Sequence, residues 1–202
     1  MRIVNIAVLA SGKGSNFEAI VNAQRRGQIR AEIKLLLVDK VKAFARQKAK
    51  RLGVREIFLS PKDYPTSLEF DRAAVKILKS EKIDLVVLAG YLRILSPYFI
   101  KKYKNRILNI HPALLPSFKG IDSIQRAFEY GCKITGVTVH LVDEKVDHGP
   151  IILQEPVWIK KGMSLELLEK KIHHLEHKLY PLAIRLFIQK KLKIKGRNVS
   201  TI

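Results

Sequence analysis

The chain has 202 residues, 47% of them hydrophobic, and its 38 Lys and Arg against 18 Asp and Glu give a formal charge of +20. This length suits one domain or a tight pair, and the apolar content supports a sizeable core, which excludes a disordered chain. The single cysteine, Cys132, excludes an internal disulfide. No run approaches the roughly 18 apolar residues of a membrane helix. Since no secretory signal is visible either, we expect a reducing, cytoplasmic setting.

The first half of the chain alternates between apolar runs and helical patterns. Strands are expected over 3–10, 33–38, 55–59, 84–89 and 106–110, and helices from Phe17 and over 41–52, 67–80 and 97–103. Near-continuous apolar runs that end at glycines are typical of strands buried on both faces of a sheet. The alternation predicts an α/β fold, with an open, mostly parallel, twisted sheet and helices on both faces.

The pattern changes after residue 111, where prolines and glycine indicate a loop. We expect a helix over 123–130, followed by strands over 134–142 and 151–159. The connection between those strands is too short for a crossover helix and so predicts an antiparallel strand near the C-terminal part.

A last helix is expected to start near Ser164, a good N-cap, and to be kinked or interrupted at Pro181. No linker or repeat is visible along the chain. We therefore expect one domain over 1–202, with halves 1–110 and 111–202.

A glycine-containing loop, Gly12-Lys13-Gly14-Ser15-Asn16, lies between the first strand and the first helix. Backbone N–H groups and the helix dipole offer an anion site there, and Ser15 is expected to cap the helix. The loop matches neither the Walker spacing nor the dinucleotide fingerprint. A tight turn without a ligand remains an equal alternative at this point.

Asn109 and His111 follow the fifth strand, where ligands of open α/β sheets bind. Being two residues apart in an extended segment, they share a face. An amide donor beside an imidazole suits a developing oxyanion and proton transfer, although a lone histidine is more often structural. Asp147 lies in a later loop, and a carboxylate brought to His111 would raise the pKa of the imidazole.

With these residues assembled, the chain resembles the glycinamide ribonucleotide transformylase family, also called phosphoribosylglycinamide formyltransferases. The resemblance spans nearly the whole chain. It rests on segments 10–16 (ASGKGSN), 86–96 (VVLAGYLRILS), 108–116 (LNIHPALLP), 136–140 (GVTVH), 147–152 (DHGPII) and 176–181 (EHKLYP). It implies a Rossmann-like formyltransferase fold and transfer of a formyl group from 10-formyltetrahydrofolate to the amine of 5'-phosphoribosylglycinamide, in purine biosynthesis. No metal is expected.

The resemblance also implies a role for individual residues. Asn109, His111 and Asp147 would be catalytic, with Asn109 donating to the oxyanion and His111 held cationic by Asp147. The substrate phosphate would be held by Gly14, Ser15 and Asn16, and the ribose by Glu176. The folate would be held by Leu92, Arg93, Ile94, Leu95, Asn109, Val142, Asp143, Glu144 and Asp147.

The sequence departs from the family pattern at three places. Lys119 replaces a usual proline, the segment 121–124 (IDSI) lacks histidines that some members carry, and Ser67 replaces a basic residue near the folate tail. These departures affect the expected substrate loop and the glutamate-tail contact, and leave the catalytic trio intact.

Two alternatives stay open within the same fold. Formyltetrahydrofolate deformylase normally has an additional N-terminal domain, and methionyl-tRNA formyltransferase an additional C-terminal domain. The sequence starts at its first expected strand and only about two dozen residues follow Leu179, so we expect neither enzyme. From a different class, a basic nucleic-acid-binding module would suit the charge, but no aromatic residues interleave the basic runs. His173 and His177 have a metal-like spacing without a third ligand. We expect small-molecule substrates, no specific nucleic acid, no membrane, and a monomer or homodimer.

Overall fold

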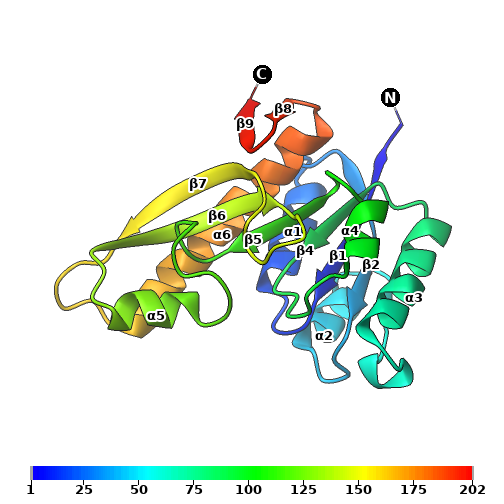
Figure 1. Ribbon diagram of the computed structural model, residues 1–202, viewed down its shortest axis with the longest axis horizontal. Coiled ribbons are helices and arrows are strands. Elements are labelled where there is room, and N and C mark those ends of the chain that lie inside the picture. The colour runs from blue at the N-terminus through cyan, green and yellow to red at the C-terminus, as the bar shows by residue number, and fades with distance from the viewer. Residues whose placement is uncertain (1, 202) are drawn as a thin grey trace. The chain divides into compact units, whose positions relative to one another are not determined.

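A seven-stranded sheet dominates the computed structural model, which describes residues 2–201 (Figure 1). The strand order is β3-β2-β1-β4-β5-β6-β7. The chain divides into two compact units, Met1–Leu108 and Asn109–Ile202. The elements of the first unit are β1 (Val4–Ala10), α1 (Ser15–Arg25), β2 (Ala31–Val38), α2 (Phe44–Arg51), β3 (Glu56–Phe58), η1 (Pro61–Asp63), α3 (Ser67–Ser80), β4 (Leu85–Leu88) and α4 (Pro97–Lys102).

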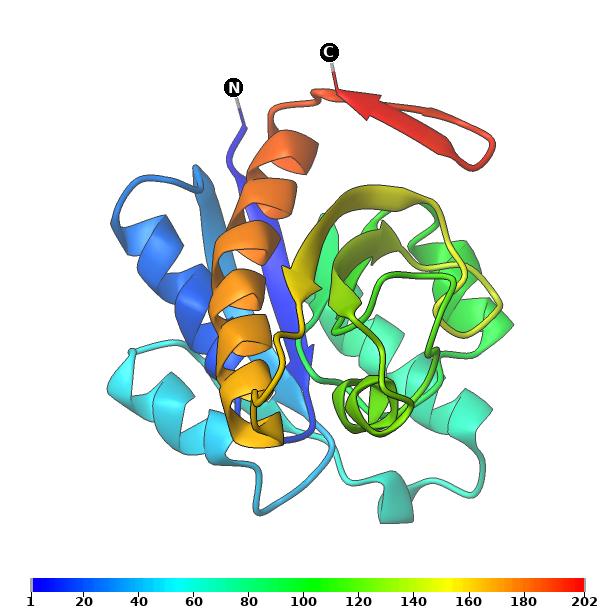
Figure 2. The same cartoon turned by 90° about the vertical axis from the view of Figure 1, so that its left-hand side faces the viewer.

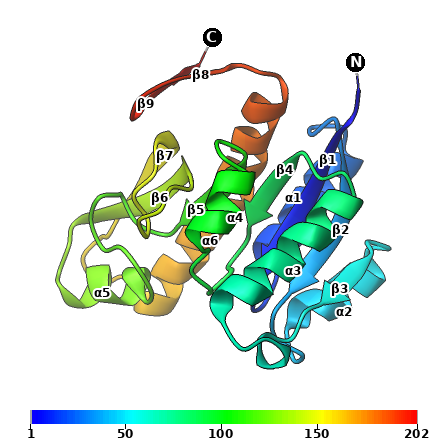
Figure 3. The ribbon, with the colours of Figure 1, turned by 45° about the vertical axis from the view of Figure 1, so that its right-hand side comes forward.

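The strands of the first unit are parallel. β1 pairs with β2 on one side and β4 on the other, and β2 pairs with β3. The last five residues of β1 are buried, as expected for a central strand covered on both faces. Helices α1 and α2 lie on one face of these strands and α3 and α4 on the other (Figure 3). The predicted fold class is confirmed here.

Local sequence accounts for the ends of several helices. α3 occupies Ser67–Ser80, the predicted range, because the Thr66 hydroxyl accepts a hydrogen bond from the Glu69 backbone N–H and Glu69 lies in the first turn. Ser96 caps α4 in the same way through the N–H of Phe99. Asp71 of α3 accepts a hydrogen bond from the N–H of Ser96 at 2.6 Å, which joins the two helices.

The second unit holds β5 (Ile107–His111, which begins in the first unit), α5 (Ser123–Glu129), β6 (Ile134–Leu141), β7 (Ile151–Trp158) and α6 (Leu165–Ile188). β6 and β7 are antiparallel, as predicted, and α6 contacts both. Ser164 caps α6 through the N–H of Leu167, also as predicted.

Of the kink or interruption expected at Pro181, the interruption is not observed. α6 continues through this residue as one helix, drawn as an unbroken coil in Figure 2. An internal proline costs a helix roughly 3 kcal/mol. Tyr180, Ala183 and Ile184 lie close to Pro181 in the sequence and are fully buried. The free energy gained by burying these side chains offsets the cost of the proline.

A C-terminal hairpin follows α6 that the sequence reading did not anticipate. β8 (Leu192–Lys195) and β9 (Asn198–Thr201) pair antiparallel, and β9 contacts β7. Figure 2 shows the hairpin at the end of α6. Leu192, Ile194 and Val199 are half-buried and alternate with exposed residues, so the apolar face of the hairpin is partly shielded from solvent.

Over residues 2–201, no helix combines the length and apolar character needed to cross a bilayer.

Candidate active site

Asn109, His111 and Asp147 come together in the second unit. β5 carries Asn109 and His111 on one face, and Asp147 lies in the loop between β6 and β7. Asn109 Nδ2 donates a hydrogen bond to Asp147 Oδ1 at 3.3 Å, and His111 Nδ1 lies 3.4 Å from Asp147 Oδ2. One carboxylate thus contacts both other side chains of the predicted trio.

Asp147 is held in place by its backbone conformation and its hydrogen bonds. Its φ of 45° is left-handed, which costs a non-glycine residue on the order of 1–3 kcal/mol and is typical of functional positions. Its Oδ2 accepts a hydrogen bond from the Gly120 N–H at 2.8 Å. Burial raises the pKa of Asp147, but the hydrogen bonds and the nearby His140 and His111 outweigh burial and lower it. The group is therefore a carboxylate at neutral pH.

Both ring nitrogens of His111 face hydrogen-bond acceptors. Nε2 lies 2.9 Å from the carbonyl oxygen of Phe118, and Nδ1 faces Asp147. A neutral ring can donate to one of these acceptors, whereas the imidazolium can donate to both. Burial opposes the positive charge more strongly than these partners favour it, so the pKa of His111 lies below its ordinary value of 6.5. The resemblance implies a cationic His111, whereas burial outweighs Asp147 in this structure and so favours the neutral ring at pH 7.

His140 completes this cluster, and the sequence reading gave it no role. It lies on β6, is 2% exposed, and its Nε2 is 3.2 Å from Asn109 Nδ2 and 3.7 Å from Asp147 Oδ1. Its Nδ1 lies 2.7 Å from the Leu141 carbonyl, which can only accept, so Nδ1 carries the hydrogen. In the neutral ring Nε2 is then an acceptor for the Asn109 amide. The sequence did hold one signal for this role: His140 lies two residues after Thr138, on the same buried face of the predicted strand.

The segment 118–122, which contains two of the departures from the family pattern, is attached to the trio. The Phe118 carbonyl contacts His111, and the Gly120 N–H contacts Asp147. The Lys119 carbonyl accepts a hydrogen bond from Arg126 Nη1 of α5 at 2.7 Å. The substituted residues therefore lie in a segment whose backbone supports the catalytic side chains.

The loop expected to cover the folate has its own network. Asp143 Oδ2 lies 2.7 Å from His148 Nδ1, and Asp143 Oδ1 accepts the Lys145 N–H at 3.1 Å. Arg197 of the C-terminal hairpin places Nη1 3.2 Å from both ring nitrogens of His148. Burial raises the pKa of Asp143, but His148, Lys145 N–H and Arg197 lower it on balance. Val142 is half-buried and Glu144 exposed.

Glu176, the predicted ribose ligand, is a buried carboxylate on α6. Its Oε2 lies 3.0 Å from His173 Nδ1, one turn earlier on the helix. Its charge also contributes to raising the pKa of His111, though less than Asp147 does. His173 is thus a partner of Glu176, and over residues 2–201 no three His, Cys, Asp or Glu residues are grouped as for a metal ion.

The predicted phosphate residues in the first unit form the start of α1. Gly14 is the N-cap with φ 68°, and Ser15 is the first helical residue, so the expected Ser15 cap was wrong. A glycine cap has no side chain, which leaves the first N–H groups of the helix for a ligand. A Cβ on Gly14 would lie 2.7 Å from the Cβ of Ala45, so this position accepts glycine alone. Asn16 is buried.

The predicted folate residues Leu92–Leu95 alternate in exposure. Leu92 is 59% and Ile94 72% exposed, whereas Leu95 is buried. Arg93 lies over the ring of Phe70 at 4.3 Å and donates to Ser67 Oγ at 3.4 Å, so its side chain packs against α3. The segment can therefore offer two apolar side chains and its backbone to a ligand, while Arg93 and Leu95 hold the segment in place.

Known proteins share this architecture along nearly the full chain. The profile of the formyl transferase family matches residues 4–184. Phosphoribosylglycinamide formyltransferase of Bacillus subtilis is 42% identical over 89% of this chain and 92% of its own length. The Haemophilus influenzae protein of the same name is 40% identical over 94% and 90%.

Solved structures agree with the sequence comparisons. Glycinamide ribonucleotide transformylase 1 of Symbiobacterium toebii superposes with a TM-score of 0.96 at 41% identity, over 99% of this chain and 94% of that one. These comparisons confirm the predicted resemblance and the predicted enzyme class. The chain belongs to the formyl transferase family.

Proposed function

We propose that the chain transfers the formyl group of 10-formyltetrahydrofolate to the amine of 5'-phosphoribosylglycinamide, a step of purine biosynthesis. The family membership and the names of the relatives support this reaction. The observation that carries the chemistry is the shared contact of Asn109 and His111 with the Asp147 carboxylate. The enzyme acts on small molecules in the cytoplasm, as a monomer or homodimer, with residues 1–202 as one functional domain.

The amine attacks the formyl carbon, and a tetrahedral intermediate forms with negative charge on oxygen. In this proposal the Asn109 amide exchanges its hydrogen-bond acceptor: one of its N–H groups leaves Asp147 Oδ1 and donates to that oxygen instead. An oxyanion accepts a stronger hydrogen bond than the 3.3 Å contact that it replaces. Losing such a donor typically costs about 2.7–4 kcal/mol of barrier height.

His111 acts as the proton carrier. Because its pKa lies below the ordinary value, the ring starts neutral, with the Nε2 hydrogen donated to the Phe118 carbonyl. Nδ1, beside Asp147, then accepts the proton that the attacking amine loses, through a water molecule. The new negative charge then adds to that of Asp147, and both stabilise the imidazolium. The ring finally gives its proton to N10 of the folate as the bond from the formyl carbon to N10 breaks. The proton that leaves the amine thus ends on N10, and the enzyme returns to its starting protonation state.

The remaining predicted residues bind the two substrates. Gly14, Ser15 and Asn16 hold the phosphate with the N-terminal N–H groups of α1, and Glu176 accepts hydrogen bonds from the ribose hydroxyls. The folate-binding residues are Leu92, Arg93, Ile94 and Leu95, of which Arg93 contributes backbone only, with Asn109, Val142, Asp143, Glu144 and Asp147. The Asp147 side chain is 9% exposed, and a charge with so little contact with solvent interacts more strongly with its neighbours than it would in water.

The full chain tests this proposal in an assay of 10-formyltetrahydrofolate consumption. We expect rapid transfer to 5'-phosphoribosylglycinamide, slow transfer to glycinamide without the phosphoribosyl group, and negligible hydrolysis. Consumption that is independent of the acceptor would instead identify a deformylase. The His111→Ala variant is the matched control, and transfer at the wild-type rate in this variant would exclude the trio as the catalytic site.

A further inference from the structure

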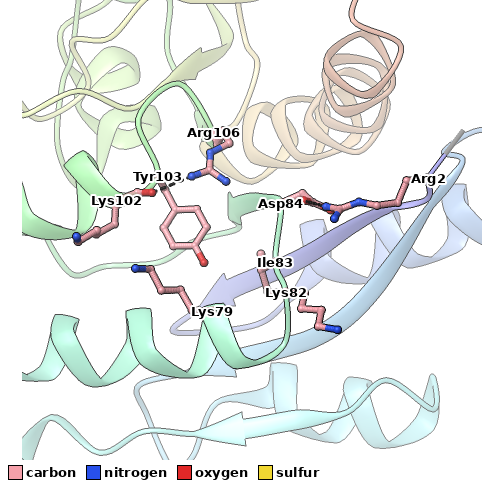
Figure 4. A pocket seen from close by; sticks show the side chains of 8 residues that line it. All are labelled: Arg2, Lys79, Lys82, Ile83, Asp84, Lys102, Tyr103 and Arg106. Carbon is pink, nitrogen blue, oxygen red and sulfur yellow. Dashed lines mark hydrogen bonds and ion pairs between the residues drawn. The ribbon is translucent and has the colours of Figure 1, made fainter.

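The first unit contains a strongly basic cavity that the proposed reaction does not use. Its volume is about 290 Å³. Figure 4 shows the residues that line it: Arg2, Lys79, Lys82, Ile83, Asp84, Lys102, Tyr103 and Arg106. Five of these eight side chains are cationic and one is anionic.

The cavity lies away from the predicted folate residues of the same unit. Ile83 and Asp84 directly precede β4, whereas Leu92–Leu95 follow its other end. Four residues of strand separate the two ends by about 13 Å. Lys79 comes from the last turn of α3 and Lys102 from that of α4. The cavity is therefore a separate feature at the amino ends of the strands.

The charges of this cavity are unbalanced. Asp84, its one carboxylate, is already paired with Arg2, and its Oδ2 accepts the Asn5 N–H at 2.9 Å. Within the described part of the chain, no carboxylate forms an ion pair with Lys79, Lys82, Lys102 or Arg106. Like charges that share one cavity repel each other, and an anion between them would remove that repulsion.

Arg106 is the fixed member of the set. Its guanidinium lies 5.0 Å from the ring centroid of Tyr103, and its Nη2 donates to the Lys102 carbonyl at 2.9 Å. Lys79 and Lys102 lie on the same side of the Tyr103 ring in Figure 4, whereas Lys82 points away from it. Lys102 Nζ lies 5.5 Å from the centroid of the Tyr98 ring and can turn from that ring to an anion, because a lysine side chain has several rotatable bonds. An anchored guanidinium and two ammonium groups that line one cavity suit several oxygens spread along a chain.

The ring of Tyr103 offers no platform for a base. The residue is 2% exposed and its ring is in contact with Arg106. Burial raises the pKa of Tyr103 to about 12, so the hydroxyl keeps its hydrogen at neutral pH. A nucleobase would gain little here, whereas phosphate oxygens would find cationic groups that have no carboxylate partner.

We propose that this cavity binds an anion with two or more linked phosphate groups, held by Lys79, Lys102 and Arg106. The phosphate chain itself is recognised, whether it comes from an inorganic polyphosphate or from a nucleoside triphosphate. The site is independent of the formyl-transfer reaction.

Calorimetric titration of the full chain with tripolyphosphate at 150 mM NaCl tests the proposal. We expect a dissociation constant below about 100 µM. The variant Lys79→Gln/Lys102→Gln/Arg106→Gln should bind at least about tenfold more weakly. The matched control is Lys50→Gln/Lys62→Gln/Lys171→Gln, which removes the same charge from exposed lysines elsewhere and should bind like wild type. Equal weakening in both variants would show a general charge effect and overturn the proposal.

Further titrations identify the source of the phosphate, and a second variant controls for loss of folding. ATP should bind with an affinity within about threefold of tripolyphosphate, because the base adds no contact. Equally tight binding of citrate would overturn selectivity for phosphate, and much tighter binding of a 20-nucleotide single strand would indicate nucleic acid instead. If the triple variant unfolds, Lys79→Gln/Lys102→Gln leaves the Arg106–Tyr103 contact intact and must still weaken binding. Formyl transfer should be unchanged in every pocket variant, so this test and that of the proposed reaction fail independently.

Discussion

The amide of Asn109 lies 3.3 Å from Asp147 Oδ1, and its second hydrogen faces His140 Nε2 at 3.2 Å. Both hydrogens therefore have acceptors within the protein. A substrate oxygen can gain one of them only by displacing an existing partner. The carboxylate contact is the longer of the two, and it is the one that the developing oxyanion replaces in the proposed reaction.

Replacing Asn109 removes this donor. We expect Asn109→Ala to lower kcat by about 10²–10³, because a lost oxyanion donor costs about 2.7–4 kcal/mol. Asn109→Asp has nearly the same size but places a second carboxylate beside Asp147, and should be at least as slow. Steady-state kinetics measure both, with thermal unfolding as the control for folding. An Asn109→Ala enzyme with wild-type kcat would contradict the role of the amide.

The protonation state of His111 gives a prediction on pH. Burial holds the pKa of His111 below 6.5, with Asp147 acting in the opposite direction. The neutral, proton-accepting ring therefore predominates above that lowered pKa, and kcat/KM should rise with pH through a midpoint below 6.5. Asp147→Asn removes a charge that raises the pKa, so the acidic limb should move to lower pH while activity falls. NMR titration of the histidine resonance that His111→Gln lacks measures the pKa directly, and a value above 6.5 would disprove the neutral ring.

His140 should act as a positioning residue for Asn109. His140→Ala leaves a buried amide hydrogen without its acceptor, which costs about 1–3 kcal/mol. We expect kcat to fall roughly tenfold with little change in KM, because His140 would act through its contact with Asn109. His140→Gln, whose side-chain oxygen can accept, should recover part of the loss. Equal losses in the two variants would indicate a packing defect instead.

The C-terminal hairpin should influence the folate through Arg197. Arg197→Gln removes the contact with His148, whose ring is paired with Asp143 in the predicted folate loop. Since an exposed polar contact contributes about 0.2–1 kcal/mol, KM for the folate should rise up to about fivefold. KM for the ribonucleotide should stay constant. Lys195→Gln is the control, because it lies on the same hairpin and is exposed; a similar change there would assign the effect to charge alone.

Gly14→Ala should weaken ribonucleotide binding. The residue has φ 68°, which costs other residues about 1–2 kcal/mol, and the new methyl group would overlap Ala45. Movement of the loop should raise KM for the ribonucleotide roughly tenfold or more. Gly12→Ala is the matched comparison, because a Cβ there meets nothing within 4 Å, and its effect should be smaller. Phosphate-site involvement would be disproved if the two variants had equal KM values.

Elements with strong local signals were predictable from the sequence. The capped and amphipathic α3 begins and ends at the predicted residues, and the short β6–β7 connection correctly predicted antiparallel strands. The side chains Asn109, His111 and Asp147 were also found, although their contact depends on distant parts of the second unit. The resemblance to family motifs identified these three side chains as one site, which the periodicity of the sequence could not do.

Effects that depend on tertiary packing were not predictable. Pro181 stays helical because buried neighbours outweigh its local cost, and the apolar pattern of the hairpin β8–β9 was too short to predict beside its basic residues. The charge of His111 depends on how much burial opposes Asp147, which no spacing in the sequence reveals. His140 was visible as part of a motif, but its role follows only from its distance to Asn109.

The contact between Gly14 and Ala45 links two segments that are remote in sequence. The Ala45 N–H also donates to the Gly12 carbonyl at 3.1 Å, so the first turn of α2 supports the loop through both its backbone and its methyl group. A valine or leucine at position 45 would press on the loop as surely as an alanine at position 14. Residues that never meet a ligand can therefore alter its affinity, and libraries aimed at new phosphorylated acceptors should keep position 45 small.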